Sequence, residues 1–306
     1  MKRTLYILIF LFLAHEVPAQ FIQGVSQYMF NGLVINPAYA GSRDALNVAV
    51  LYRDQWKDFE GAPVYQYFSA HAPVKNEKMG LGLLVMNEKI GIEKSTGVYG
   101  NYAYKVGLKK GSVSFGFKAG LNTFKADLNQ VKTIEEGDVA FNSGDIEKFI
   151  IPNFGFGVYY ISSNLFLGGS IPLLLNRVQD EERGEHVLIS NPRNYNYFFS
   201  GGGLFSYNES IQIKPTFLLK YHNLSPVQID LTTSLIYKNK IWFGLTYRYN
   251  EALATIVEFQ LNEQLRIGYA YDYTLNMLRT HNGGSHEFLI EYEFKYRIKA
   301  YHPRYF

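Results

Sequence analysis

Apolar and polar side chains alternate with a period of two along most of the chain after residue 45. Three consecutive stretches show this most clearly. One face of each stretch is apolar and rich in aromatic residues: Ile241, Phe243, Leu245, Tyr247 and Tyr249, then Leu253, Thr255, Val257, Phe259 and Leu261, then Leu265, Ile267, Tyr269, Tyr271 and Tyr273. A period of two indicates β-strands, because successive side chains of a strand point to opposite faces. Each stretch is about ten residues long, the length that a tilted strand needs to cross a bilayer.

The same alternation predicts about fourteen strands, which is an even number. We expect them at approximately 46–53, 63–72, 79–88, 96–107, 112–124, 150–161, 164–172, 195–207, 210–221, 226–237, 240–249, 252–261, 264–275 and 285–298. Tight turns rich in Gly, Asn, Ser and Lys, as hairpins require, are expected within 106–113, 160–166, 206–212, 237–242 and 260–266. Longer links are expected at 54–62, 89–95, about 125–149, about 173–194 and 276–284.

Short turns on one rim, long loops on the other and an even strand number are typical of an outer-membrane β-barrel. Tyrosines gather at the predicted strand ends, as an interfacial aromatic girdle would: Tyr52, Tyr102, Tyr104, Tyr221, Tyr237, Tyr247, Tyr249, Tyr271 and Tyr273. We therefore predict an all-β fold over residues 45–306, a transmembrane antiparallel β-barrel with short periplasmic turns and longer extracellular loops. A soluble sandwich or propeller would also alternate, but the polar face carries too many charges for a dry core.

The first nineteen residues have the pattern of a removable signal peptide. Lys2 and Arg3 precede an apolar run from Leu5 to Leu13, and small residues follow at 17–19. The apolar run is about nine residues long, well short of the roughly 20 that a spanning helix needs. We expect 1–19 to be removed and the protein to reach the cell outer membrane.

Composition agrees with an exported barrel. The chain has 25 Tyr, 23 Phe and 27 Gly, and its mean hydropathy of -0.12 is close to neutral, which alternation of apolar and polar residues explains. The net charge is only +3 and the basic residues are dispersed, so a nucleic-acid partner is not expected. Cysteine is absent, so no disulfide framework holds the fold.

Charges of both signs occupy the face opposite the apolar one, which we expect to line the barrel interior. They are Lys214, Lys220, Asp230, Arg248, Glu258, Arg266, Asp272, Glu287, Glu291, Glu293 and Lys295. A selective pore usually shows one dominant sign at a constriction, whereas mixed charges on adjacent strands favour cross-strand pairs that brace the lumen. The lumen charges of most interest are Arg248, Glu258, Arg266, Asp272 and Glu291.

No pattern of catalytic residues is found. The histidines at 71, 186, 222, 281 and 286 form no motif with a serine, and their spacing suggests no metal site. The stretch 135–145, "EEGDVAFNSGD", has acidic residues and glycines like a calcium loop but lacks EF-hand spacing, so a solvated external loop is favoured. We expect no enzymatic activity and no cofactor.

The stretch 27–56, "QYMFNGLVINPAYAGSRDALNVAVLYRDQW", carries a specific signature. Its core is Asn36-Pro37-Ala38-Tyr39-Ala40-Gly41, followed by Arg53, Gln55 and Trp56 and then by Gly61-Ala62-Pro63. With "GAPVYQYFSAHAPV", "GLGLLVMNEKIG" and the terminal "YHPRYF", the chain resembles the PorP/SprF family of type IX secretion system outer-membrane proteins, essentially from residue 20 to its end. One departure is Gly32, where the family pattern leads us to expect Pro.

The resemblance implies a non-enzymatic outer-membrane part of the Bacteroidetes machinery that exports, and in some members anchors, large cell-surface proteins such as gliding adhesins. It implies contacts with outer-membrane lipid, with other type IX secretion components in the periplasm and outer membrane, and with the C-terminal domain of an exported cargo protein. The alternative that the residues leave open is an outer-membrane diffusion channel or small-solute transporter of similar barrel build.

The segment 20–44 precedes the first predicted strand. Asn36-Pro37 disfavours helix and favours an extended or turn geometry, and the aromatic residues around it need burial. We expect this segment to plug the periplasmic mouth or to dock on periplasmic partners; a merely packed N-terminal extension is the simpler alternative. The partner or plug candidates are Tyr28, Phe30, Asn36, Pro37, Tyr39, Gly41, Arg53 and Trp56.

Overall fold

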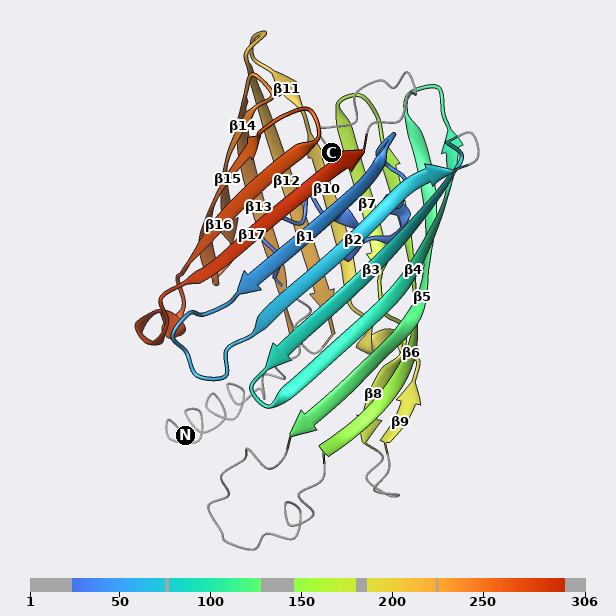
Figure 1. Cartoon of the computed structure of the whole chain (residues 1–306), viewed down its shortest axis with the longest axis vertical. Coiled ribbons are helices and arrows are strands. Elements are labelled where there is room, and N and C mark those ends of the chain that lie inside the picture. Colours follow the sequence, from blue (N-terminus) through green and yellow to red (C-terminus); the bar gives the residue numbers. More distant parts are fainter. Residues whose placement is uncertain (1–23, 75–76, 128–145, 180–185, 224, 295–306) are drawn as a thin grey trace, which may run out of the picture.

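The computed structural model describes residues 24–74, 77–127, 146–179, 186–223 and 225–294 (Figure 1). Within these residues, fourteen long antiparallel strands form a barrel. They are β1 (Leu46–Asp54), β2 (Val64–Val74), β3 (Met79–Ile90), β4 (Glu93–Gly107), β5 (Ser112–Asp127), β6 (Ile146–Ile161), β7 (Leu165–Ile171), β10 (Tyr197–Gly203), β12 (Ile211–His222), β13 (Ser225–Tyr237), β14 (Ile241–Arg248), β15 (Ala252–Gln260), β16 (Leu265–Thr274) and β17 (Ser285–Phe294). Every one overlaps a strand that the alternation predicts.

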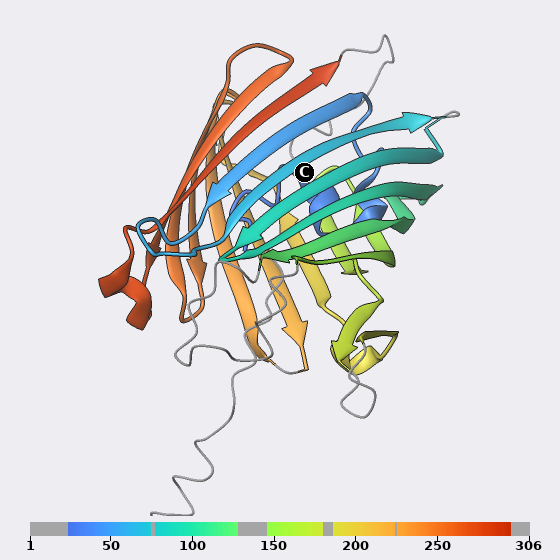
Figure 2. The same ribbon diagram turned by 60° about the horizontal axis from the view of Figure 1, so that its bottom comes forward.

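The ring of strands is closed. Each strand pairs with its neighbours along the chain, and β1 pairs with β17 from Leu46↔Phe294 to Asp54↔His286. The predicted strand at 195–207 is divided at Leu204 into β10 and the two-residue β11 (Phe205–Ser206), and both pair with β12. Figures 1 and 2 show these strands as a continuous wall around the N-terminal segment. Closure excludes an open sandwich or propeller.

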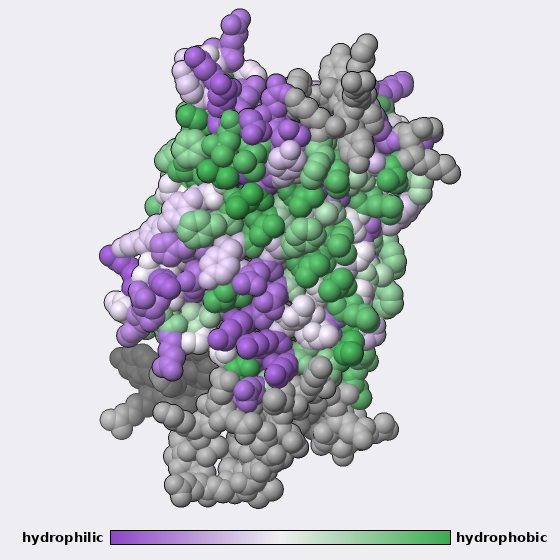
Figure 3. Space-filling model, in the orientation of Figure 1, coloured by the Kyte–Doolittle hydropathy of each residue, from purple (hydrophilic) through white to green (hydrophobic). Residues whose placement is uncertain are grey.

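Exposure alternates along the strands with the predicted phase. On β14, Phe243 and Leu245 are exposed at the outer surface, whereas Trp242 and Thr246 are buried inside. The apolar outer residues form the hydrophobic band seen in Figure 3, and exposed tyrosines such as Tyr104 and Tyr249 lie near its edges. In the described ranges, no helix has the length and apolar content needed to span a membrane.

The two rims differ in their connections. β1 begins and β17 ends at the upper rim of Figure 1, which also carries the tight turns 108–111, 162–164, 238–240 and 261–264. The lower rim carries the link 55–63, the 3-10 helix η5 (Met277–His281), and a β7–β10 link that contains β8 (Asn176–Gln179), β9 (His186–Ile189) and η4 (Pro192–Asn194). Since outer-membrane barrels have short periplasmic turns, the upper rim is the periplasmic rim and the lower one the extracellular rim.

One predicted long link is wrong. Within 89–95, β3 continues to Ile90 and β4 begins at Glu93, so the connection is only the two-residue turn Gly91-Ile92, with Gly91 at φ 55°. The polar and charged residues around this turn resemble a loop in sequence, but here they are the exposed ends of two paired strands. Short connections at 223–224 and 249–251 also lie at the extracellular rim. The signal peptide, the candidate calcium loop at 135–145 and Lys295 lie outside the described residues.

Candidate functional site in the barrel lumen

The residues 24–45, here called the lumen segment, lie inside the barrel. The segment contains two 3-10 helices, η1 (Gly32–Val34) and η2 (Pro37–Tyr39). Every residue from Val25 to Arg43 is buried. A polar and aromatic stretch of this kind would be exposed to water outside the barrel. Its burial therefore depends on contacts with the inner face of the wall.

The backbone at the start of the lumen segment binds a carboxylate of the wall. The amides of Ser26 and Gln27 donate to the two oxygens of Glu287 on β17, at 2.9 and 2.7 Å. Glu287 is fully buried, and Arg53 on β1, its direct cross-strand partner, lies 3.2 Å away. Two backbone donors and one guanidinium therefore satisfy a charge that would otherwise be costly to bury.

A second buried carboxylate, Asp272 on β16, joins two arginines to the same part of the segment. It lies 2.7 Å from Arg53 and 3.1 Å from Arg248 on β14. The Ser26 hydroxyl donates to Asp272 at 2.8 Å and accepts from Arg248 at 3.1 Å. Arg248 also pairs with Asp230, its direct neighbour across β13 and β14, at 3.2 Å. We call Ser26, Arg53, Arg248, Asp272 and Glu287 the first anchor.

The other end of the lumen segment is held by Arg43. Its guanidinium lies 2.8 Å from Glu291 and 3.4 Å from Glu293, both on β17. Glu291 also accepts from Asn47 at 2.6 Å and pairs with Arg266 on β16 at 3.2 Å. This second anchor, Arg43 with Glu291, Asn47 and Arg266, fixes the point where the segment turns into β1.

Between the anchors, the Asn36-Pro37 turn touches the opposite wall. The Asn36 side chain accepts from the amide of Ala38 at 2.9 Å, capping η2, and donates to the carbonyl of Val158 on β6 at 3.0 Å. Ser170 on β7 donates to the carbonyl of Ile35 at 2.6 Å. Asn36 therefore has two uses: it caps the turn and it binds a backbone carbonyl of the wall.

Glycines of the wall let the segment approach closely. A Cβ at Gly157 would lie 2.0 Å from Asn36 Oδ1, one at Gly116 would lie 2.1 Å from the Ala38 amide nitrogen, and one at Gly80 would lie 2.0 Å from the Ala40 carbonyl oxygen. These separations are far below van der Waals contact. Three strands of the wall thus lack side chains where the lumen segment touches them.

Aromatic side chains of the lumen segment complete the contacts. The ring centre of Phe30 lies 5.4 Å from Lys214 Nζ and 4.9 Å from the guanidinium carbon of Arg266, two basic residues of the wall. Tyr39 packs edge-on against Tyr159 at 5.5 Å. Tyr28 donates to Thr216 on β12 at 3.3 Å.

Little space remains beside the central part of the segment. The hollow between it and the wall of β6, β7 and β10 measures about 20 Å³ and is lined by Tyr28, Met29, Gly32, Ile35, Asn36, Tyr39, Tyr159, Phe166 and Ser200. A cavity needs a volume of about 10–15 Å³ to hold a single water molecule. The hollow therefore has room for about one water and for no larger solute.

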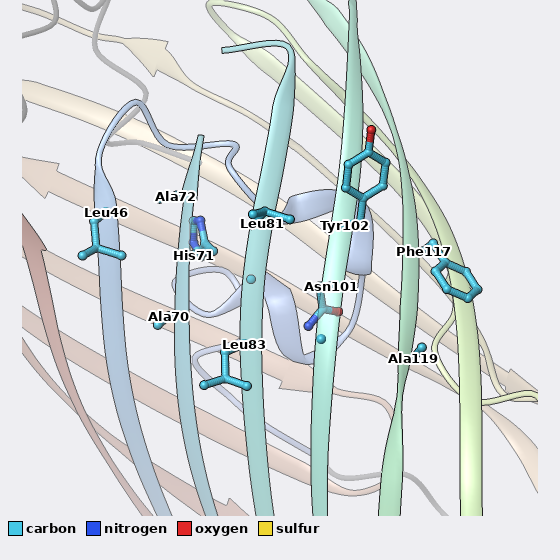
Figure 4. A pocket seen from close by; sticks show the side chains of 12 residues that line it. Leu46, Ala70, His71, Ala72, Leu81, Leu83, Asn101, Tyr102, Phe117 and Ala119 are labelled. Carbon is cyan, nitrogen blue, oxygen red and sulfur yellow. The ribbon is translucent and has the colours of Figure 1, made fainter. Parts of the chain in front are cut away.

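A larger hollow, of about 650 Å³, lies on the outer surface of β1 to β5 (Figure 4). Its outer side chains include Leu81, Leu83, Tyr102 and Phe117, while η1 and η2 lie behind the strands. Its lining is mostly apolar and it faces the position of lipid, with His71 and Asn101 as the polar residues of the lining.

The structure brings most of the sequence-predicted residues together in the lumen. Those residues are Tyr28, Phe30, Asn36, Pro37, Tyr39, Gly41, Arg53, Arg248, Glu258, Arg266, Asp272 and Glu291, all of them buried. Trp56 is the exception, because it lies half-buried in the link 55–63 at the extracellular rim, where its amide donates to Ser285. Sequence reasoning did not single out Ser26 or Arg43, although both lie within or next to the motif-bearing stretch.

The lumen contacts are mainly hydrogen bonds and ion pairs between the segment and the wall. Asp272 and Glu287 are satisfied by arginines and by donors of the lumen segment, whereas Glu258 has Arg266 at 3.9 Å and no hydrogen-bond partner among the residues that the structure describes. The described residues contain no group of three or more potential metal ligands. What the arrangement can do chemically is hold a segment of the chain across the barrel interior.

Comparisons with known proteins extend this picture. A family model described as "Type IX secretion system membrane protein PorP/SprF" matches residues 18–292. No curated protein matches the chain. The fold is similar to the CymD monoaromatic hydrocarbon channel, with 11% identity and a TM-score of 0.50 over 88% of this chain and 94% of that chain.

Two further outer-membrane proteins show weaker likeness. The toluene transporter TodX of P. putida has 11% identity and a TM-score of 0.47, covering 88% of this chain and 95% of that chain. Omp33 of Acinetobacter baumannii has 7% identity and a TM-score of 0.48, covering 83% and 100%. At such identities the similarity to solved structures concerns the barrel fold alone.

Proposed function

Because the chain belongs to the PorP/SprF family of type IX secretion system membrane proteins, we propose that it supports the secretion or cell-surface anchoring of large surface proteins, such as gliding adhesins. It acts without enzymatic chemistry, from the outer membrane, through contacts with other proteins. In this role the barrel is a membrane-embedded platform, and the lumen segment keeps it closed.

The observation that supports this proposal is the occupied lumen. The segment contacts β16 and β17 through Ser26, β6 through Asn36, and β17 again through Arg43. Tyr28 reaches β12. Since these strands lie around the whole ring, the segment crosses the interior and does not merely line one side of it. A protein that acts as a platform can function with an occupied lumen, whereas a diffusion channel requires a continuous path through the barrel.

The alternative is a diffusion channel or small-solute transporter. The likeness to hydrocarbon channels gives it no support beyond the barrel fold. It would require the lumen segment to leave, breaking the hydrogen bonds of Ser26 and Gln27 at the first anchor and the ion pairs of Arg43 at the second. We therefore prefer the secretion role, with partners at the two rims: other secretion components at the periplasmic rim, where the lumen segment enters β1, and the C-terminal domain of the cargo.

A strain that lacks this protein tests the proposal. We expect surface and culture-medium fractions to lose one or more large exported proteins, which accumulate in the periplasm, and wild-type protein to restore them. A matched measurement follows uptake of small solutes in the same strains. Unchanged surface proteins together with impaired uptake would contradict the secretion role and support the channel.

A further inference from the structure

Three lysines stand side by side on the outer wall at the extracellular rim. Lys89 on β3 is directly opposite Lys94 on β4, and Lys94 is directly opposite Lys125 on β5. All three are exposed. In the backbone register the row continues to residue 148 of β6, also a lysine. Like charges placed directly opposite each other on adjacent strands are destabilising, so this row is costly unless an anion lies against it.

The described acidic residues do not neutralise the row. Lys57, at the same rim, pairs with Asp54 at 3.1 Å, but none of the three lysines forms an ion pair within the described part of the chain. They line a hollow of about 50 Å³ together with Gly91, Ile92 and Asp127. Three lysines and one aspartate leave this hollow with a net charge of +2.

The outer side chains become less polar with distance from the lysine row toward mid-membrane. Two residues nearer mid-membrane, the outer positions of the same strands are Asn87, Thr96 and Thr123, again in direct register. Asn87 accepts from Thr96 at 3.0 Å and donates to Gln66 of β2 at 3.0 Å. This row therefore presents neutral hydrogen-bonding groups.

The next row toward mid-membrane is apolar. It consists of Val85, Val98 and Leu121, in register on the same three strands. From mid-membrane to the extracellular rim, the outer wall thus reads apolar, then neutral polar, then cationic. Figure 3 shows the corresponding change from hydrophobic to hydrophilic residues toward the lower end of this face.

An amphiphile with acyl chains, a polar linking region and a phosphate matches these three rows in order. We propose that the outer wall of β3–β5 binds a phosphorylated lipid of the outer leaflet, with its phosphate on the row Lys89, Lys94 and Lys125. Lysine ammonium groups and phosphate form charge-assisted hydrogen bonds, which are stronger than neutral ones. The apolar row distinguishes a lipid from a free phosphate ion.

The strands β14, β15 and β16, on another part of the wall, differ from β3–β5 in this respect. At the extracellular ends of β14, β15 and β16 the outer residues are Tyr247, Leu253 and Tyr273, without a lysine row. The bound lipid would therefore mark one side of the barrel.

The test uses the full chain in detergent micelles, titrated with lipid A that carries its phosphates and followed by native mass spectrometry. The variant K89Q/K94Q/K125Q should bind this lipid at least about tenfold more weakly than wild type, because the charge-assisted contacts are lost. The control K109Q/K110Q removes two exposed lysines at the periplasmic rim and should change binding by less than about twofold, since those charges lie far from the site. Heat-modifiable gel mobility checks that each variant is folded.

Two ligand controls complete the test. Lipid A without phosphates should bind wild type at least about tenfold more weakly, and inorganic phosphate should not displace the lipid. The proposal is overturned if the triple variant binds like wild type, if removing the lipid phosphates has no effect, or if the K109Q/K110Q control loses as much affinity. Full displacement by inorganic phosphate would make the row a simple anion site and would overturn the lipid assignment.

Discussion

The guanidinium of Arg53 lies 2.7 Å from the carboxylate of Asp272, although β17 separates their strands, β1 and β16. Side chains two strands apart meet here because both point into the lumen. The Ser26 hydroxyl lies between them, within 2.8 Å of Asp272 and 3.3 Å of Arg53. The wall charges and the lumen segment therefore form one buried network rather than two independent features.

Replacing Asp272 with Asn should destabilise the barrel strongly. The substitution removes one carboxylate from both arginines, while Arg53 keeps Glu287 and Arg248 keeps Asp230. The loss should therefore approach but not exceed that of a fully broken buried ion pair, about 3–5 kcal/mol. The free energy of unfolding in denaturant, followed in detergent or lipid, measures this loss. Asp54→Asn is the control: its partner Lys57 is exposed, so less than about 1 kcal/mol should be lost. Equal losses would show that the lumen network contributes no special stability.

Alanine at Gly157 should displace the lumen segment. The added Cβ would fall 2.0 Å from Asn36 Oδ1, so the turn must move and its bond to Val158 must weaken. We expect a loss of about 1–3 kcal/mol, as for other overpacked sites, and faster proteolysis within residues 24–45. Gly100→Ala adds the same methyl group on the outer surface, 3.8 Å from the nearest atom, and should be neutral. Equal behaviour of the two variants would contradict close packing of the segment.

Arginine scanning distinguishes a filled lumen from an open one. Phe243 faces lipid at 52% exposure, and Arg there should cost about 2–4 kcal/mol if it lies at the bilayer midplane. Ala270 faces inward and is completely buried. In a water-filled pore Arg at Ala270 would be tolerated, but in the filled lumen it has no room, and we expect a loss at least as large as for Phe243→Arg. A well-folded Ala270→Arg variant with near-native unfolding would contradict the filled lumen.

The strand pattern could be predicted because a barrel repeats one local rule. Side chains such as Phe243 and Trp242 face lipid and lumen in turn, and a period of two is visible without knowledge of the partners. The turn at Gly91 was missed because β3 and β4 extend beyond the apolar band, where their outer residues become polar. Strand ends outside the membrane carry no hydrophobic alternation by which to recognise them.

The site was only partly predictable. Asn36-Pro37 and the aromatic residues around it indicated a shaped and buried segment, and the inward charges could be read from the strand phase. The pairing of Ser26 with Asp272 spans 246 positions in the chain, and nothing local in the sequence indicates it. Trp56 is among the plug candidates because it belongs to the signature, but it lies past the end of β1 at the rim.

A disulfide can test whether the lumen segment stays in place during secretion. Ser69 on β2 donates to Asn31 of the segment at 2.8 Å, and the chain has no cysteine of its own. We expect the oxidised Asn31→Cys/Ser69→Cys variant to restore surface display of the cargo as well as its reduced form does, because the platform works with its lumen closed. Loss of display on oxidation, recovered by reduction, would show that the segment must leave.

Single-channel conductance in planar bilayers tests the central claim, that the lumen segment closes the barrel, most directly. Wild-type protein should insert without opening a steady conducting path. A variant lacking residues 21–44, selected for heat-modifiable folding, should conduct, because the inward faces of the strands remain and the segment between them is gone. A wild-type protein that conducts steadily, or a folded deletion variant that stays silent, would contradict the account.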